Sequence, residues 1–80
     1  MIRLLVADDH EIVRSGLVQL LSMRPGFAVV AEAATAADTL ARARDPAIDI
    51  VLLDLHMPGA SGVPLIEALR RVRPGLPILV

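Results

Sequence analysis

The 80-residue sequence contains no cysteine, tryptophan or tyrosine, and Phe27 is its only aromatic residue. Without cysteine, the chain has no disulfide framework and no thiolate metal site. The formal net charge is −1 and acidic and basic residues are interspersed, so this segment carries no electrostatic footprint for nucleic acid. No apolar run approaches the roughly 20 residues that a membrane span needs.

No signal peptide is expected at residues 1–9, because Arg3 interrupts a short apolar run that leads into two aspartates. These absences fit a cytoplasmic protein with no membrane partner. The length allows one domain at most, and a core of this size is often marginal on its own. A hydrophobic content of 55% with a single aromatic residue suits a parallel sheet covered by helices.

Short aliphatic runs alternate with helical patterns along the whole chain. Strands are expected at residues 2–7, 27–33, 49–54 and 76–80, where aliphatic runs are bounded by turn or polar residues. Helices are expected between Asp9 and Pro25, from Ala36 through Arg44, and from Ser61 or Gly62 through Arg73. Strict alternation with short connections predicts an α/β fold, in which a doubly wound parallel sheet carries helices on both faces.

Local signals indicate how these helices begin and which residues face the solvent. Asp9 is expected to cap the first helix and Thr35 the second. Arg70, Arg71 and Arg73 suit the C-terminal end of the third helix, where they are expected to form a solvated face. The first helix is expected to be amphipathic. Its apolar positions are Ile12, Val13, Gly16, Leu17, Leu20 and Leu21.

Three aspartates are predicted to meet at one edge of this sheet. Asp54 follows the apolar run at residues 50–53, and Asp8 and Asp9 follow the first strand. If these two strands are parallel neighbours, three carboxylates converge, and two full charges about 5 Å apart repel by roughly 3 kcal/mol at an effective dielectric near 20. Such a cluster needs protonation, hydration or a bridging cation. Oxygen ligands alone suit a hard divalent ion such as Mg²⁺.

Simpler interpretations remain open for the same residues. Asp8 and Asp9 could be a helix cap and its solvated neighbour, and Asp54 could be a turn residue ahead of the turn expected at Pro58-Gly59. The side chains of His10 and His56 are expected to be exposed loop residues rather than ligands. These interpretations assign no chemistry to the edge of the sheet.

Taken together, the motifs resemble the receiver domain of bacterial two-component response regulators. The matching residues are Asp8-Asp9 after the first strand, Asp54 at the end of the third, and Met57-Pro58-Gly59 with Gly62 after it. Residues 4–17 look like the NarL/FixJ (LuxR-type) subfamily, whose members usually carry a C-terminal helix-turn-helix DNA-binding domain. The resemblance implies a flavodoxin-like sheet with strand order 2-1-3-4-5 in the intact family.

The resemblance also implies a function. Asp54 would accept a phosphoryl group from the phosphohistidine of a sensor histidine kinase, in a Mg²⁺-dependent reaction that controls a transcriptional output domain. Asp9 would be a direct metal ligand and Asp8 would act partly through water. Asp54 itself and the backbone carbonyl of His56 would complete the set. The implied protein is a regulatory phosphoacceptor rather than an enzyme, at most with self-phosphorylation and dephosphorylation.

The family pattern continues with residues that this chain does not contain. A Ser or Thr follows the fourth strand, an aromatic lies on the fifth and a Lys follows it, whereas this chain has no lysine and ends at Val80. We therefore expect residues 1–80 to be the N-terminal part of a receiver domain, truncated within strand four and without a second domain. Any contact with DNA would be made by a C-terminal domain absent from this chain.

Two further expectations follow from this pattern. An edge strand at residues 76–80 and an uncovered helix face bearing Leu17, Leu20 and Leu21 would favour a dimer or a larger assembly. The alternative function is a truncated or pseudo-receiver that acts only as a protein–protein interaction module. A hydrolase with an aspartyl nucleophile on a similar sheet is a third class, but no additional acid or base is evident for it.

Overall fold

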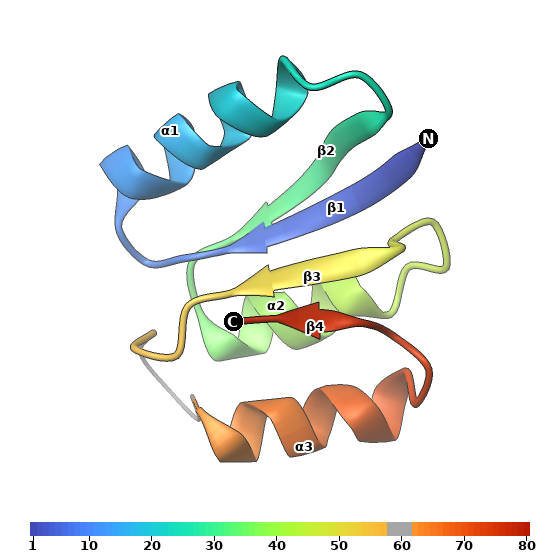
Figure 1. Ribbon diagram of the computed structural model, residues 1–80. Helices are drawn as coiled ribbons and strands as arrows, with labels where there is room; N and C mark the ends of the chain where they lie inside the picture. The colour runs from blue at the N-terminus through green and yellow to red at the C-terminus, as the bar shows by residue number, and fades with distance from the viewer. Residues whose placement is uncertain (58–61) are drawn as a thin grey trace.

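Aliphatic runs and helical segments alternate as the sequence predicts. The computed structural model of the protein describes residues 1–57 and 62–80 (Figure 1). The strands are β1 (Ile2–Ala7), β2 (Phe27–Ala33), β3 (Ile50–Leu53) and β4 (Ile78–Leu79), and the helices are α1 (Glu11–Ser22), α2 (Ala36–Ala43) and α3 (Val63–Val72). All pairings are parallel and the order is β2-β1-β3-β4, which confirms the expected α/β sheet.

The register of the sheet places the ends of the central strands level with one another. Ala7 is paired with Ala33 of β2 on one side and with Leu53 of β3 on the other. The ladder continues one residue further, because the amide of Asp8 donates to Ala33 O at 2.9 Å and the amide of Asp54 donates to Ala7 O at 2.9 Å. The residues that follow β1 and β3 therefore leave the sheet side by side.

The opposite end of the same strand pair is fixed by Arg3 and Asp49. The amide of Asp49 donates to Arg3 O at 2.8 Å, and the amide of Arg3 donates to Asp49 Oδ2 at 2.7 Å. The hydrogen bond from the Arg3 amide outweighs the effect of burial and, with the Arg3 guanidinium, lowers the pKa of Asp49 below its ordinary value of 3.8. These two hydrogen bonds fix the register of β3 against β1 at the residue that precedes β3.

One face of the sheet carries the core, together with α2 and α3. Because side chains alternate along a strand, Leu5 and Ala7 of β1 share a face with Val51 and Leu53 of β3. All four are buried and belong to one cluster with residues of both helices. The members of this cluster are Leu5, Ala7, Ala33, Ala36, Ala43, Ile48, Val51, Leu53, Met57, Leu65, Leu69 and Leu76.

The other face is covered less completely. Helix α1 packs there over β1 and β2, and none of its residues is buried in the described structure (Figure 1). Of its six apolar positions, Ile12 and Leu20 are 87% and 66% exposed and Val13 is also exposed, so the expected apolar side is only partly used. The reason is geometric: the apolar positions span a wide arc of the helix, whereas the sheet contacts only part of that arc.

The sequence predicted the N-cap of α2 correctly but not the N-cap of α1. Thr35 caps α2 as expected, with its side chain accepting from the amide of Asp38 at 3.1 Å. The N-cap of α1 is His10, so the expectation that Asp9 caps this helix was wrong. Asp8 turns the chain instead, because its Oδ1 accepts from the amide of His10 at 2.8 Å, and the helix begins only at Glu11.

The third helix begins after a segment that is not described. The turn expected at Pro58-Gly59 and the alternative helix start at Ser61 lie outside the described residues. Gly62 is the N-cap of α3 with φ of 66°, a left-handed conformation that favours glycine. Among the described residues, no helix combines the length and apolarity that a membrane crossing requires.

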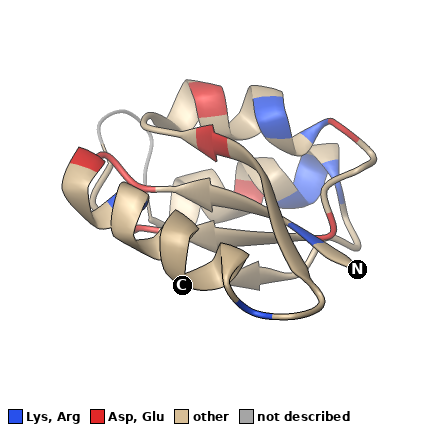
Figure 2. Ribbon diagram, turned by 90° about the horizontal axis from the view of Figure 1, so that it is seen from above, with Lys and Arg blue, Asp and Glu red and all other residues tan. Residues whose placement is uncertain are grey.

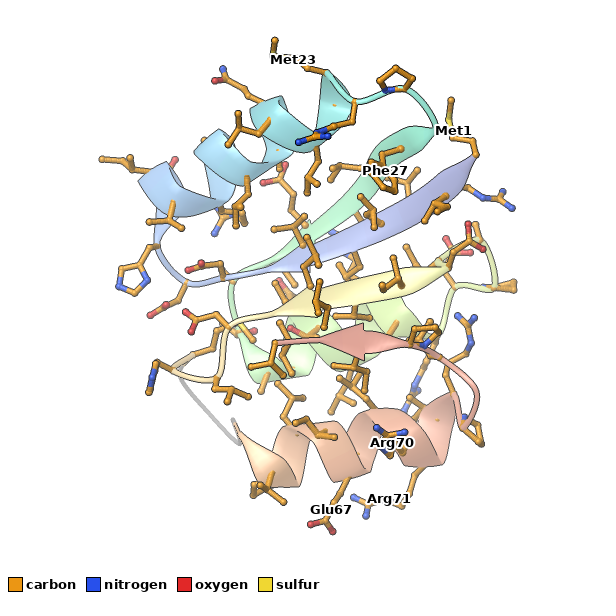
Figure 3. All side chains as sticks on the ribbon, in the orientation of Figure 1. Met1, Met23, Phe27, Glu67, Arg70 and Arg71 are labelled. Atoms are coloured by element: carbon orange, nitrogen blue, oxygen red, sulfur yellow. The ribbon has the colours of Figure 1, made fainter. Side chains whose placement is uncertain are left out.

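Arg73 does not belong to a solvated face, contrary to expectation. Its Nη1 donates to Ala43 O at 3.0 Å and to Asp45 O at 2.8 Å, and its Nη2 donates to Ile48 O at 2.9 Å. The backbone leaves the helical conformation at this residue, which directs the side chain toward α2. Arg71 does remain exposed, and its side chain points away from the sheet (Figure 3).

We predict that Arg73→Met lowers the free energy of unfolding by about 2 kcal/mol, because three carbonyls lose a charged donor. Arg71→Met, at an exposed position of the same helix, should change it by less than about 0.5 kcal/mol. Urea denaturation followed by circular dichroism measures both. Equal effects of the two substitutions would contradict the role assigned to Arg73.

A second prediction concerns the dependence of stability on pH. A carboxylate with a lowered pKa stabilises the fold fully above its unfolded pKa of about 3.8, and this contribution is lost as pH falls through the folded pKa. Asp49→Asn keeps an acceptor but removes the charge, so its stability deficit relative to the parent should be largest near neutral pH and shrink in acid. Urea midpoints from about pH 7 down to about pH 2.5 test this. A deficit that stays constant over the range would refute it.

Candidate functional site

Acidic side chains gather where the central strands end. Figure 2 shows acidic residues at the carboxyl ends of the strands, beside the first turn of α1. Asp8 is buried, whereas Asp9 and Asp54 are partly exposed. One atom from each of Asp8, Asp9, His10 and Asp54 lies within 4.8 Å of the others. The structure therefore brings together the three carboxylates that the sequence predicted to converge, and it adds a histidine.

The imidazole of His10 lies over the carboxylates. Its Nδ1 is 3.1 Å from Asp8 Oδ1, 3.1 Å from Asp9 Oδ1 and 3.8 Å from Asp54 Oδ2. The side chain is 64% exposed, so the expectation of an exposed residue was correct, but the ring nitrogen faces the cluster. The available signal was its position directly after Asp8-Asp9, where a tight turn folds the ring back over the strand ends.

Charge in the cluster shifts the pKa values of two groups in opposite directions. Burial by itself raises the pKa of Asp8, but the hydrogen bond from the His10 amide and the contact with the His10 ring outweigh it, and the pKa is lowered. The contact with Asp8, followed by the charge of Asp9, raises the pKa of His10. The carboxylates thus favour the protonated form of the imidazole, and the imidazole favours the ionised form of Asp8.

One oxygen of the cluster lacks a donor. Asp9 Oδ1 is buried and accepts no hydrogen bond from the described residues, although His10 Nδ1 approaches it to 3.1 Å. A buried carboxylate oxygen without a donor is costly, because it has lost water and gained no partner. An oxygen of this kind fits a cation ligand, and the carboxylate-rich surroundings fit a divalent ion.

Asp54 sits at the start of a tight turn. Its Oδ1 accepts from the amide of His56 at 3.0 Å, while the imidazole of His56 is exposed and makes no contact with the cluster. Met57, the next residue, is buried in the core and anchors this connection. Oδ2 of Asp54 remains on the side of His10. The turn therefore fixes one carboxylate oxygen of Asp54 by a hydrogen bond, and the other oxygen faces the cluster.

Arg14 supports the site, and the sequence reasoning did not identify it. Its Nη1 donates to Asp8 O at 2.7 Å, and its Nε donates to Glu32 Oε1 at 3.0 Å. The side chain thus ties the first turn of α1 and the backbone of Asp8 to β2. An arginine on a helix carries no signal for such a contact, because the partner lies on a strand 18 residues later in the sequence.

An apolar hollow adjoins the carboxylates between α1 and the sheet. Its volume is about 520 Å³, and it reaches from Asp8 and Asp54 to the end of β4. Leu17 contributes from α1, and Leu52 and Leu79 contribute from β3 and β4. The site is therefore polar at the strand ends and apolar beside them.

Comparison with known proteins identifies related chains. The family model for the response regulator receiver domain matches residues 4–80. The chain is 38% identical over 79 residues to the response regulator GacA of Pseudomonas viridiflava, covering 99% of this chain and 37% of that protein. It is 45% identical over 69 residues to the nitrate/nitrite response regulator protein NarP of Escherichia coli, covering 86% and 32%.

Solved structures give the same result. A LuxR-family two-component response regulator from Aurantimonas superposes with a TM-score of 0.88 at 41% identity, covering 95% of this chain and 54% of that one. RcsB from Salmonella enterica, bound to promoter P1flhDC in the presence of the phosphomimetic BeF₃⁻, superposes with a TM-score of 0.88 at 29% identity, covering 96% and 39%. The chain thus spans about a third of the length of the curated relatives. By both its sequence and its fold, it belongs to the response regulator receiver domain family.

Proposed function

We propose that Asp54 accepts a phosphoryl group from the phosphohistidine of a sensor histidine kinase. The observation that carries this proposal is the convergence of Asp54 with Asp8 and Asp9 at the carboxyl edge of a receiver-type sheet. A carboxylate in this position is accessible, held by a backbone hydrogen bond and surrounded by groups that can bind a cation. Receiver domains are regulatory, so the reaction serves signal transduction rather than metabolism.

The chemistry requires an oxygen nucleophile and charge neutralisation. Because the His56 amide holds Asp54 Oδ1, Oδ2 is the oxygen that attacks phosphorus. A bond forms between this oxygen and phosphorus while the phosphorus–nitrogen bond of the donor breaks, and the electron pair leaves with the imidazole of the kinase. The product is an acyl phosphate on Asp54. Phosphoryl transfer depends mainly on positioning and electrostatics, which suits this compact set of residues.

The residues fit a magnesium ion. Asp9 would bind it directly through the oxygen that lacks a donor, Asp8 would act partly through water, and Asp54 and the backbone carbonyl of His56 would complete the set. When bound, the ion would neutralise the negative charge of the carboxylates and of the phosphoryl oxygens. Arg14 holds the backbone of Asp8 and thereby positions both members of the acid pair.

The signal would pass to other parts of a longer protein. We propose that residues 1–80 are the N-terminal part of a receiver domain in a cytoplasmic regulator, since the chain spans 37% and 32% of two curated relatives. One similar structure is of RcsB bound to promoter DNA with a phosphomimetic. By analogy, DNA would be contacted by a domain other than these 80 residues, in response to the state of Asp54.

Metal binding provides the first test of this proposal. We predict weak binding of Mg²⁺ or Mn²⁺ that is largely lost in Asp9→Asn, because the substitution removes a charged ligand. Asp38→Asn, at an exposed acid on α2, is the matched control and should bind as the parent does. Calorimetry and NMR titration measure the affinity. Equal binding by a folded Asp9→Asn variant would remove Asp9 from the site.

Phosphorylation provides the second test. Acetyl phosphate with Mg²⁺ should add one phosphoryl group, visible as a mass increase of the intact chain, and Asp54→Asn should abolish it. The yield in the 80-residue form should be lower than in a longer form of the protein, because the family's lysine partner is not among these residues. Asp38→Asn should label normally. Labelling that persists in Asp54→Asn would place the acceptor elsewhere.

Self-association is the third part of the proposal. The apolar hollow, the exposed Leu20 of α1 and the exposed end at Leu79 and Val80 form an apolar surface of a kind that is unusual on a monomer. A similar structure is described as two RcsB dimers on DNA, with a TM-score of 0.89. We propose that a second copy of the 80-residue chain covers this surface.

The prediction is a dimer or larger assembly at micromolar concentration in sedimentation experiments. Leu20→Glu should shift the population toward monomer without lowering the unfolding midpoint, because the side chain is 66% exposed. Val63→Glu, at a similarly exposed position on α3, should leave association unchanged. If Leu20→Glu remains fully associated, the interface lies elsewhere, such as the edge of β4. A compact parent monomer would refute association altogether.

A further inference from the structure

One possible donor atom from each of Asp8, Asp9, His10 and Asp54 lies within 4.8 Å of the others. Neighbouring ligands of an octahedral ion with bonds of roughly 2.1 Å lie about 3 Å apart. His10 Nδ1 is 3.1 Å from both Asp8 Oδ1 and Asp9 Oδ1, and it is 3.8 Å from Asp54 Oδ2. The two 3.1 Å distances match those between neighbouring ligands, and the contact with Asp8 is a hydrogen bond. A cation shared by these atoms would take the place of the proton between them.

The position of His10 is fixed at its backbone from both sides. Its amide donates to Asp8 Oδ1 at 2.8 Å, and its carbonyl accepts from the amide of Arg14 at 2.8 Å as the first bond of α1. Residues in this arrangement cannot move the ring away without a change of side-chain rotamer. These bonds fix the backbone of His10, and the ring nitrogen lies 3.1 Å from Asp9 Oδ1, the buried oxygen that accepts no hydrogen bond from the described residues.

The chemistry of the donor set decides which ions it prefers. Carboxylate and water oxygens suit Mg²⁺, whereas imidazole nitrogen suits Zn²⁺, Cu²⁺ and Ni²⁺. Among divalent ions of the first row, affinity for a mixed nitrogen and oxygen site increases toward copper. Adding one imidazole to three carboxylates changes the binding of these late ions far more than it changes the binding of Mg²⁺.

We propose that Nδ1 of His10 is a ligand in this site, and that the site therefore binds late first-row divalent ions, with Ni²⁺ as the example, more tightly than its carboxylates alone would. Coordination requires a free lone pair on Nδ1, so any proton on this nitrogen is released to solvent when the ion binds. Such an ion would compete with Mg²⁺ for the same carboxylates. This proposal rests on the metal site of the proposed function and assigns it a selectivity.

The binding test compares Ni²⁺ with Mg²⁺ by calorimetry at about pH 8, because coordination needs a nitrogen without a proton. His10→Gln should weaken Ni²⁺ binding by about 10- to 100-fold and change Mg²⁺ binding by less than about 3-fold. His10→Asn, which introduces a preferred N-cap residue, is the second variant in case glutamine disturbs α1. Asp38→Asn, at an exposed acid on α2 that does not belong to the cluster, is the matched control and should change neither affinity.

Pulsed electron paramagnetic resonance of the Cu²⁺-loaded chain gives a direct readout of the ligand. The parent and Asp38→Asn should show modulation from an imidazole nitrogen, and His10→Gln should not. Modulation that is absent from the parent, or that persists in His10→Gln, would overturn the proposal. Equal losses of Ni²⁺ and Mg²⁺ affinity in both His10 variants would also overturn it, since His10 would then act only on the local structure.

These outcomes are separable from those of the proposed function. If Asp9→Asn binds Mg²⁺ as the parent does, the magnesium site fails whatever His10 does. If Asp9→Asn loses Mg²⁺ while His10→Gln binds Ni²⁺ as the parent does, the magnesium site stands and only the nitrogen ligand fails.

Discussion

The parallel ladder between β1 and β3 is the constraint on which the site depends. Pairing of Ala7 with Leu53, extended by the amides of Asp8 and Asp54, leaves two carboxylate-bearing residues next to each other at the same edge. Their mutual repulsion is offset by the amides of His10 and His56 and by the imidazole of His10. A shift of one residue in this register would separate the acids and turn their side chains to opposite faces.

The two faces of the sheet differ in what they contribute. The face under α2 and α3 holds the buried cluster and supplies most of the cohesion, with Arg73 tying α3 to the α2–β3 connection. The face under α1 is only partly covered and borders an apolar hollow that begins at Asp8 and Asp54. A chemical change at Asp8 or Asp54 would therefore occur next to an incompletely covered apolar surface. A further segment of chain or a second copy could contact that surface.

The sequence predicted the elements, their order and the convergence of Asp8, Asp9 and Asp54, because hydrophobic runs and parallel connectivity determine them. It did not predict that His10 rather than Asp9 is the N-cap of α1, because the hydrogen bond from the His10 amide to Asp8 Oδ1 delays the start of the helix. Arg73 and the unidentified Arg14 contact backbone far away in the sequence, so their roles depend on tertiary structure. Metal ligation by Asp8, Asp9, Asp54 and the His56 carbonyl stays a prediction.

The central claim is that Asp54 accepts a phosphoryl group with help from the neighbouring acids. The most direct measurement is ¹⁹F NMR of the chain with BeF₃⁻ and Mg²⁺, since this anion stands in for a phosphoryl group on a carboxylate. The account predicts bound fluorine resonances that require Mg²⁺, vanish in Asp54→Asn and remain in Asp38→Asn. Bound resonances that persist in Asp54→Asn, or that form equally without Mg²⁺, would contradict it.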